Sequence, residues 1–321
     1  MNGVKADSAA SSGSVVPIES AQEGQLAALV TALSEASNGL RRQTCECPNR
    51  QPLPSRDAVI GVVEALRTVL FPGYFGPSDL TEENLVFHIG STLDRIRRDV
   101  REQIKRGICF NCEERDGLCD ARADSATQHF LARLLAVREM LATDVQAAYE
   151  GDPAARNPDE TIFCYPGILA VMNYRLAHEL YALGVPLIPR MITEHAHSIT
   201  GIDIHPGATI DEAFFIDHGT GVVIGETSVI GKRVRLYQGV TLGAKSFPLD
   251  EEGNPIKGID RHPIVEDEVV IYSEATILGR VTIGRGSVIG GNVWLTHGVP
   301  PNSVITQAQV REDLFESGGG I

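Results

Sequence analysis

Apolar residues recur every three or four positions in several stretches of the first part of the chain, which is the spacing of an amphipathic helix. Ser55 precedes one such stretch as a candidate N-cap, and the Pro72-Gly73 pair ends it. Four helices are predicted: Ser55 to Pro72, 78–82 to Gly107, Asp124 to 151–153, and Pro166-Gly167 to Gly184. Residues 1–20 and 41–56 have the composition of a tail and a linker.

Beyond residue 200 the apolar period changes to six. Small or β-branched residues often stand four positions later, and glycine often follows the aliphatic residue directly. A six-residue period is typical of a parallel β-helix, in which each short strand points one aliphatic side chain inward and glycine permits the corner. Stacked coils then bury a continuous aliphatic column. The thirteen aliphatic positions are Ile204, Ile210, Ile216, Ile224, Ile230, Leu236, Leu242, Val265, Ile271, Ile277, Ile283, Ile289 and Leu295.

This period breaks at two places that carry polar residues. Ile216 and Ile224 are eight residues apart, and the segment between them reads Asp217-His-Gly-Thr-Gly221. Leu242 and Val265 are twenty-three residues apart, five more than three repeats, and that segment ends in Asp260-Arg-His-Pro263. Loops that project from a rigid scaffold are common places for function, so we expect the chemistry at these breaks.

Composition supports the same division of the chain. Of the 32 glycines, sixteen lie between residues 201 and 300, where the β-helix needs corners. The net charge of −14 argues against general nucleic-acid binding, because such a chain repels the phosphate backbone. No apolar run approaches the ~18–20 residues of a membrane helix. The segment 1–20 lacks the apolar region of a secretory signal, so a cytoplasmic location is the default expectation.

Imidazole and charged side chains gather around the two breaks. Three repeats complete one coil and return the chain to the same corner. Asp203 and His218 are 15 residues apart, about one coil once the local slip is included, so a carboxylate can lie beside an imidazole. Such a pair suits activation of a hydroxyl nucleophile. A solvated histidine on a corner is the simpler interpretation of any one of these residues.

Four runs in the last half of the chain resemble the serine O-acetyltransferase family. The resemblance covers roughly residues 145–305 and rests chiefly on the Asp-His-Gly-Thr-Gly and Arg-His-Pro runs, with a Gly-Asp-Pro-Ala before them. It implies an α + β chain: a mainly helical domain (1–199, of which 1–20 is a disordered tail), a left-handed parallel β-helix of hexapeptide repeats (200–311) and a flexible tail (312–321). The runs are Gly201–Gly207, Phe215–Thr227, Gln238–Gly243 and Arg261–Pro263.

The resemblance also implies a reaction and the residues that perform it. The family transfers acetyl from acetyl-CoA to the hydroxyl of L-serine, the first step of cysteine biosynthesis. His218 matches the general base, and Asp203 matches the carboxylate that orients it. Arg261 and His262 match the pair that binds the substrate carboxylate, which a guanidinium fork suits. Asp152 and Asp217 match the family's acidic residues around the substrate amino group. Gly151-Asp152-Pro153 also has the sequence of an ordinary turn.

Cofactor and partners follow from the same resemblance. Gly243, Ala244, Ser273 and Gly291 match positions that line the acetyl-CoA groove, and no metal is expected. The family forms trimers or dimers of trimers, so a homotrimer or hexamer is expected. A C-terminal isoleucine after glycine, here Ile321, is the segment by which the family binds O-acetylserine sulfhydrylase.

Three other interpretations compete with this one. Another hexapeptide acyltransferase, acting on a sugar or xenobiotic hydroxyl, would keep His218 as base but would not need charged groups for a zwitterion. A β-helix carbonic anhydrase would need three converging histidines, and the arginine beside His262 would repel a cation. A non-catalytic scaffold would gain nothing from the slip at Asp217 and His218.

Two features depart from the family pattern. The excursion from Ala244 to Asp260 is longer than the short loop common in the family, and it suggests a lid. Five of the six cysteines lie before residue 120, and buried or free thiols are favoured over a metal site because the paired spacing of a zinc site is missing. These five are Cys45, Cys47, Cys109, Cys112 and Cys119.

Overall fold

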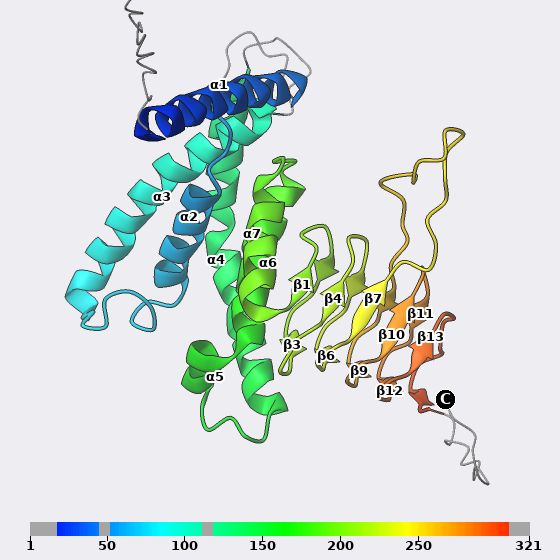
Figure 1. Ribbon diagram of the computed structural model, residues 1–321. Coiled ribbons are helices and arrows are strands. Elements are labelled where there is room, and N and C mark those ends of the chain that lie inside the picture. Colours follow the sequence, from blue (N-terminus) through cyan, green and yellow to red (C-terminus); the bar gives the residue numbers. More distant parts are fainter. Residues whose placement is uncertain (1–17, 45–51, 111–117, 308–321) are drawn as a thin grey trace, which may run out of the picture. The chain divides into compact units, whose positions relative to one another are not determined.

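The computed structural model describes residues 18–44, 52–110 and 118–307, with the side chains of 18–23 and 38–44 left out. These residues belong to two compact units. The helix α1 (Ile18–Thr44) lies in the first unit, and the second unit contains the other helices and the strands (Figure 1). None of the helices within the described ranges has the length and apolar character needed to cross a membrane.

Six helices form the first part of the second unit, and four of them match the predicted segments. Ser55 caps α2 by accepting the N–H of Ala58. The helix α3 continues past Gly107, and α4 starts before Asp124, whereas α5 and α7 were not predicted from the sequence. The bounds are α2 (Arg56–Leu70), α3 (Glu82–Phe110), α4 (Cys119–Gly151), α5 (Pro158–Cys164), α6 (Pro166–Ala182) and α7 (Ile188–Thr200).

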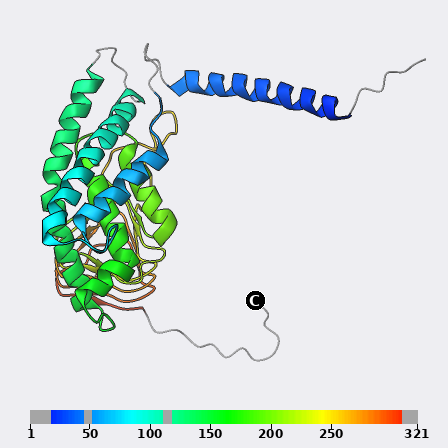
Figure 2. The same ribbon diagram turned by 90° about the vertical axis from the view of Figure 1, so that its left-hand side faces the viewer.

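Fourteen short strands follow in the described residues and wind into a β-helix with three parallel sheets (Figures 1 and 2). The sheets are β1-β4-β7-β10-β13, β2-β5-β8-β11 and β3-β6-β9-β12-β14. This is the parallel β-helix that the six-residue period predicts, and its left hand is the one that the family resemblance implies. The strands are β1 (Asp203–Ile204), β2 (Thr209–Ile210), β3 (Phe215–Ile216), β4 (Val223–Ile224), β5 (Val229–Ile230), β6 (Arg235–Leu236), β7 (Thr241–Gly243), β8 (Ile264–Val265), β9 (Val270–Ile271), β10 (Thr276–Leu278), β11 (Thr282–Ile283), β12 (Val288–Ile289), β13 (Trp294–Leu295) and β14 (Val304–Ile305).

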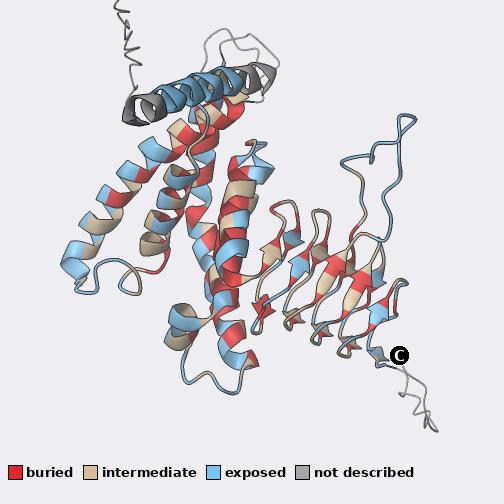
Figure 3. Cartoon of the chain, viewed as in Figure 1, coloured by how far each residue is buried: buried red, intermediate tan, exposed pale blue. Residues whose placement is uncertain are grey.

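The core of the β-helix is the predicted aliphatic column. All thirteen aliphatic residues of the six-residue series are buried, each at the second position of its strand, as the red positions inside the coils show (Figure 3). At the corners several non-glycine residues adopt the left-handed conformation, among them Arg233, Glu268 and Asn292. Removing such a column from water contributes about 25 cal/mol per Å² of apolar surface, which is the main stabilising term of a coil stack.

Helices α4 and α6 cover the open end of the first coil. A terminal coil has unpaired backbone groups, and side chains from these helices satisfy several of them. Tyr174 donates its hydroxyl to the carbonyl of Ala208 at 2.6 Å and accepts the N–H of Ile210 at 3.1 Å. The buried carboxylate of Asp144 accepts the N–H of Phe214 at 2.9 Å and pairs with Arg175. The helical part therefore acts as a cap that fixes the first coil.

The second break in the period is an insertion at one corner. Val223 pairs with Thr241, three regular repeats further along the chain, whereas Thr241 pairs with Thr276 on the next coil, almost twice as far along. The excursion is therefore a single repeat step with a long insertion, and the sequence-based count of three repeats plus five residues was wrong. The predicted boundary at 199/200 falls one residue before the end of α7, and β1 begins three residues later, at Asp203. A division into separate domains there stays a prediction.

Candidate active site

The corner between β3 and β4 carries His218. Its backbone φ is 54°, and its side chain is 75% exposed, so the imidazole projects into solvent. Nε2 of His218 lies 4.0 Å from Oδ1 of Asp217. Gly219 has a φ of 89°, and a Cβ there would come within 2.4 Å of the Ile202 side chain. The glycine lets the chain turn tightly, and the turn presents the histidine outward.

Asp152 reaches this corner from the helical part. It is the C-cap residue of α4. Its carboxylate accepts the N–H of Ala154 at 2.8 Å and the hydroxyl of Tyr165. The Tyr165 hydrogen bond, the Ala154 amide and the charge of His218 lower the pKa of Asp152. Burial and the neighbouring Asp152 carboxylate raise the pKa of Tyr165.

The charged groups at this corner are close enough to influence one another: they are Asp152, Asp217 and His218. Asp217 also raises the pKa of Tyr165, and His218 lowers that of Asp152. The sequence pointed to all three residues but missed Tyr165, which stands just before Pro166-Gly167 and carries no motif of its own. The arrangement offers carboxylates for a cation beside an imidazole that can accept a proton.

Asp203 lies on the coil next to that of His218. The corner before Asp203 is tied to the following coil by the N–H of Gly221, which donates to the carbonyl of Gly201 at 2.8 Å. The carboxylate of Asp203 lies close to Glu194 and His197 of α7, with their ligand atoms within 4.8 Å of one another. Among the described residues no hydrogen bond or ion pair joins Asp203 to His218. The predicted pairing of these two residues stays a prediction.

The group of Glu194, His197 and Asp203 has donor atoms close enough to share a metal ion. Nδ1 of His197 lies 3.5 Å from Oε2 of Glu194. The guanidinium of Arg190 also forms an ion pair with Glu194. That positive charge already neutralises one carboxylate of the group, so the surroundings favour a network of protein charges over a cation.

His262 lies in a second cluster, at the end of the excursion. Its Nδ1 accepts the backbone N–H of Thr227 at 3.0 Å, and its ring lies against the Cα of Gly225. Burial and the positive charge of Arg261 lower the pKa of His262 to about 4. The ring is therefore neutral at physiological pH.

Arg261 is held by a carboxylate within the chain. Its Nη2 donates to Oε2 of Glu226 at 2.6 Å, and Tyr181 of α6 donates to Oε1 of the same carboxylate at 3.1 Å. Burial alone would raise the pKa of Glu226, but the hydrogen bonds and positive charges around it, led by Arg261, together lower the pKa. His205 lies half-buried beside Tyr181, with ring centroids 5.8 Å apart. Burial and the charge of Arg190 lower the pKa of His205.

The two clusters occupy different corners of the β-helix. His218 stands between β3 and β4, whereas Arg261 and His262 stand between β7 and β8. No hydrogen bond or ion pair joins the clusters in the part of the chain that the structure describes. A single chain therefore does not bring the predicted base next to the predicted carboxylate-binding pair.

The four predicted cofactor residues also form two pairs. Ser273 and Gly291 lie on neighbouring coils at the corners before β10 and β13. A Cβ on Gly291 would lie 3.2 Å from the carbonyl oxygen of Ser273. Gly243 ends β7, and Ala244 begins the excursion. These pairs stand at different corners, like the two charged clusters.

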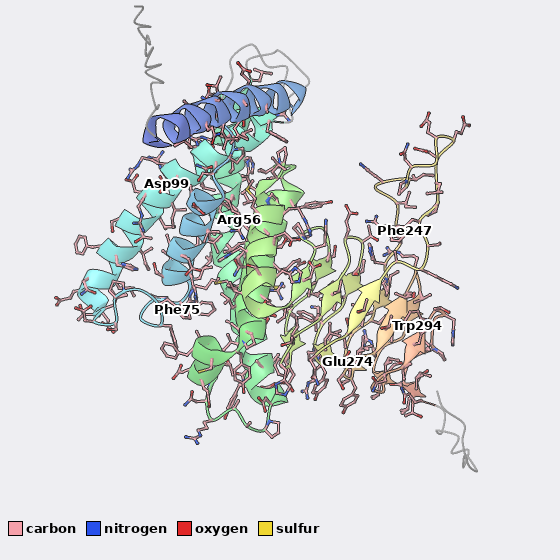
Figure 4. The ribbon with its side chains drawn as sticks, viewed as in Figure 1. Arg56, Phe75, Asp99, Phe247, Glu274 and Trp294 are labelled. Carbon is pink, nitrogen blue, oxygen red and sulfur yellow. The ribbon has the colours of Figure 1, made fainter. Side chains whose placement is uncertain are left out.

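The excursion forms an exposed arm that leaves the β-helix. Leu249 and Pro255 form an isolated antiparallel bridge, and the N–H of Ile256 donates to the carbonyl of Pro248 at 2.9 Å. Phe247 is 61% exposed on this arm (Figure 4). This arm exposes the apolar side chains of Phe247, Leu249 and Ile256, which could cover a ligand or a neighbouring chain, and the predicted lid stays a prediction.

Only part of the cysteine set is described. Cys109 is buried at the end of α3, Cys119 begins α4, and Cys164 is exposed. Cys45, Cys47 and Cys112 lie outside the described residues, as does Ile321. The predicted roles of these residues stay predictions.

A β-helix of six-residue repeats that presents an exposed imidazole at a corner fits the class of protein that the sequence predicted, the hexapeptide-repeat acyltransferases. No family model matches the chain. The chain is 53% identical over 302 residues to the plasmid serine acetyltransferase of Synechococcus elongatus, covering 92% of this chain and 95% of that relative. The chain therefore belongs to the serine acetyltransferase family, as the sequence motifs predicted, and is an acetyl-CoA-dependent O-acetyltransferase.

Solved structures agree with this assignment. Serine acetyltransferase 1 of Entamoeba histolytica in complex with L-cysteine is 37% identical, with a TM-score of 0.68, over 82% of this chain and 90% of that one. The soybean serine acetyltransferase complexed with serine is 26% identical, with a TM-score of 0.50, over 78% of this chain and 96% of that one. The predicted fold class is confirmed by these neighbours.

Proposed function

We propose that this chain transfers the acetyl group of acetyl-CoA to the hydroxyl of L-serine, with His218 as the general base. The observation that carries the proposal is the exposed imidazole of His218, flanked by Asp217 and near Asp152, in a chain of this family. A serine hydroxyl is a weak nucleophile at pH 7, and a neutral imidazole can take its proton during attack on the thioester carbonyl.

The carboxylates at this corner have two tasks in the proposal. Asp152 and Asp217 bind the ammonium group of serine, which places its hydroxyl near Nε2 of His218. The low pKa of Asp152 keeps that carboxylate charged well into the acid range. Asp203 stabilises the imidazolium that forms.

The carboxylate of serine is bound by Arg261 and His262. These residues lie at another corner of the chain, so the proposal requires two subunits to form one site. A homotrimer, or a hexamer of two trimers, brings a corner of one β-helix against a different corner of the next. Acetyl-CoA lies in the same seam, between Gly243 and Ala244 of one subunit and Ser273 and Gly291 of its neighbour.

Two further parts of the proposal concern ligands and location. The Entamoeba relative was solved with L-cysteine, which differs from serine by one sulfur for oxygen, so we propose that cysteine competes at the same site. Ile321 would mediate binding to O-acetylserine sulfhydrylase. Deleting Ile321 should abolish capture of that enzyme in a pull-down, and unchanged capture would refute this part. The cytoplasmic location stays a prediction.

The proposed function is tested by measuring thiol release from acetyl-CoA with L-serine, compared with a panel of sugars and other hydroxyl compounds. We expect release with L-serine and little with the others. A preference for a sugar or a xenobiotic hydroxyl would instead support the alternative hexapeptide acyltransferase.

A further inference from the structure

Thr227 contacts both of the residues that we assign to the substrate carboxylate. Its Oγ1 accepts the backbone N–H of Arg261 at 2.9 Å and that of His262 at 3.1 Å. The same oxygen lies 3.0 Å from Nδ1 of His262, and the backbone N–H of Thr227 donates to Nδ1, also at 3.0 Å. One threonine therefore fixes the backbone of two residues and the ring of one.

These contacts determine where the proton of the His262 ring sits. A backbone N–H points at Nδ1, so Nδ1 must be the acceptor of the neutral imidazole. The Thr227 hydroxyl already accepts two N–H groups, which leaves its own hydrogen to donate to the same nitrogen. The proton of the neutral ring is then on Nε2. In the hydrogen bonds of the described residues Nε2 has no partner, and it is not among the fully buried side-chain atoms that lack one, so this N–H can be reached by a ligand.

The surroundings keep this ring neutral. His262 is only 6% exposed, and the positively charged groups that face it are Arg261 and Arg280. Arg280 donates to the carbonyl oxygens of both Thr227 and His262. Glu226 is the one opposing charge among the groups that shift the pKa of His262, and it is already paired with Arg261. His205 adds a further small repulsion.

We propose that Thr227 is a positioning residue that locks His262 as the Nε2–H tautomer, so that the site presents a neutral N–H donor beside the Arg261 guanidinium. Arg261 supplies the charge for an anionic carboxylate, and His262 supplies a hydrogen bond of fixed direction. This deepens the proposed function and rests on it for the identity of the ligand, but the tautomer itself does not depend on the reaction.

The tautomer is tested by NMR of the full chain labelled with ¹⁵N-histidine at pH 7.5. The signal of His262 is identified by its loss in the His262→Asn variant. We expect a neutral ring protonated on Nε2 in the wild type and in Thr227→Ser. Thr227→Val keeps the backbone N–H but loses the hydroxyl that anchors the His262 backbone beside it, so we expect a smaller share of that tautomer there. An Nδ1–H tautomer or an imidazolium in the wild type would overturn the proposal, even if Thr227→Val failed to fold.

Kinetics then separate positioning from general damage. Without the hydroxyl, both backbone anchors are lost, and KM for L-serine should rise by about tenfold, the size of a hydrogen bond to a charged ligand. KM for acetyl-CoA should stay within twofold, and Thr227→Ser should restore the serine KM. A Thr227→Val enzyme with unchanged serine KM would contradict the proposal. If no serine acetylation is found while the Nε2–H tautomer is present, the proposed function fails and the tautomer lock stands.

Discussion

The imidazole ring of His262 lies directly against the Cα of Gly225. A Cβ built on Gly225 would come within 2.0 Å of Cδ2 and 2.1 Å of Nε2 of that ring. The backbone φ of Gly225 is outside the left-handed region, so space alone requires glycine at this position. Gly225 packs against one side of the His262 ring, and the backbone N–H of Thr227 donates to Nδ1 of the ring. These two contacts fix the position of the ring.

Replacing Gly225 by alanine should therefore displace His262. We expect the serine KM to rise by about tenfold or more and the free energy of unfolding to fall by about 1–3 kcal/mol, as for other overpacked sites. Steady-state kinetics and urea denaturation measure the two effects. Gly61→Ala is the matched control, because nothing lies within 4 Å of a Cβ there and a helix gains stability from alanine. A Gly225→Ala enzyme with normal serine KM would show that the ring position does not matter.

Removing the imidazole at position 218 should abolish most of the activity. Asparagine is the suitable replacement because the backbone φ of His218 is 54°, a conformation that asparagine tolerates better than alanine. We expect kcat to fall by about 10²–10⁴-fold, the usual contribution of a general base, with the thermal midpoint nearly unchanged. His129→Asn, at an exposed position on α4, serves as the control. Wild-type rates in His218→Asn would refute its role as base.

The hydrogen bond between Tyr165 and Asp152 predicts a specific pH effect. That bond is the largest cause of the lowered pKa of Asp152. In Tyr165→Phe the carboxyl pKa should return toward its ordinary value, so Asp152 becomes protonated at a higher pH. The measurement is the Kd of L-serine as a function of pH in the His218→Asn background, which removes the titrating imidazole from the site. The acid limb of binding should move to higher pH, and the basic limb should stay in place.

Tyr74→Phe is the control for this pH effect, because Tyr74 donates to Asp159 and makes no contact with Asp152 in the described residues. It should leave the pH profile unchanged. An acid limb that does not move in Tyr165→Phe would mean that Asp152 does not bind the substrate in its charged form.

Most of the β-helix could be predicted because its repeat is local. Except at the two breaks, each inward residue stands six positions from the next, and Ile204, Ile271 and Ile289 are as buried as the pattern requires. The helices α1, α5 and α7 were missed. Two of them are short and carry few repeats of the apolar pattern, and α1 (Ile18–Thr44) overlaps the segments 1–20 and 41–56, whose composition we interpreted as a tail and a linker. Helix α7 nevertheless positions Glu194 and His197 beside Asp203.

The surroundings of the candidate site could not be predicted, because the insertion hides the register. Thr227 and His262 lie side by side although they are 35 residues apart, since Val229 pairs with Ile264 across the same coils. A regular coil of three six-residue repeats would place the neighbour of Thr227 about 18 residues later, not at His262. Tyr165 and Tyr181 reach the corners from helices α5–α6, and no spacing within the repeats marks them.

The separation of His218 from Arg261 makes a prediction about assembly. If each site takes His218 from one subunit and Arg261 from its neighbour, two inactive variants can restore each other. His218→Asn and Arg261→Met should each be nearly inactive alone. When co-expressed in equal amounts, a quarter of the interfaces pair an intact His218 with an intact Arg261, so about a quarter of wild-type activity should return. The control is a mixture of His218→Asn with Asp152→Ala, which alter the same side of the site and should show no recovery. If the first mixture also stays inactive while forming mixed trimers, the complete site must lie within one chain.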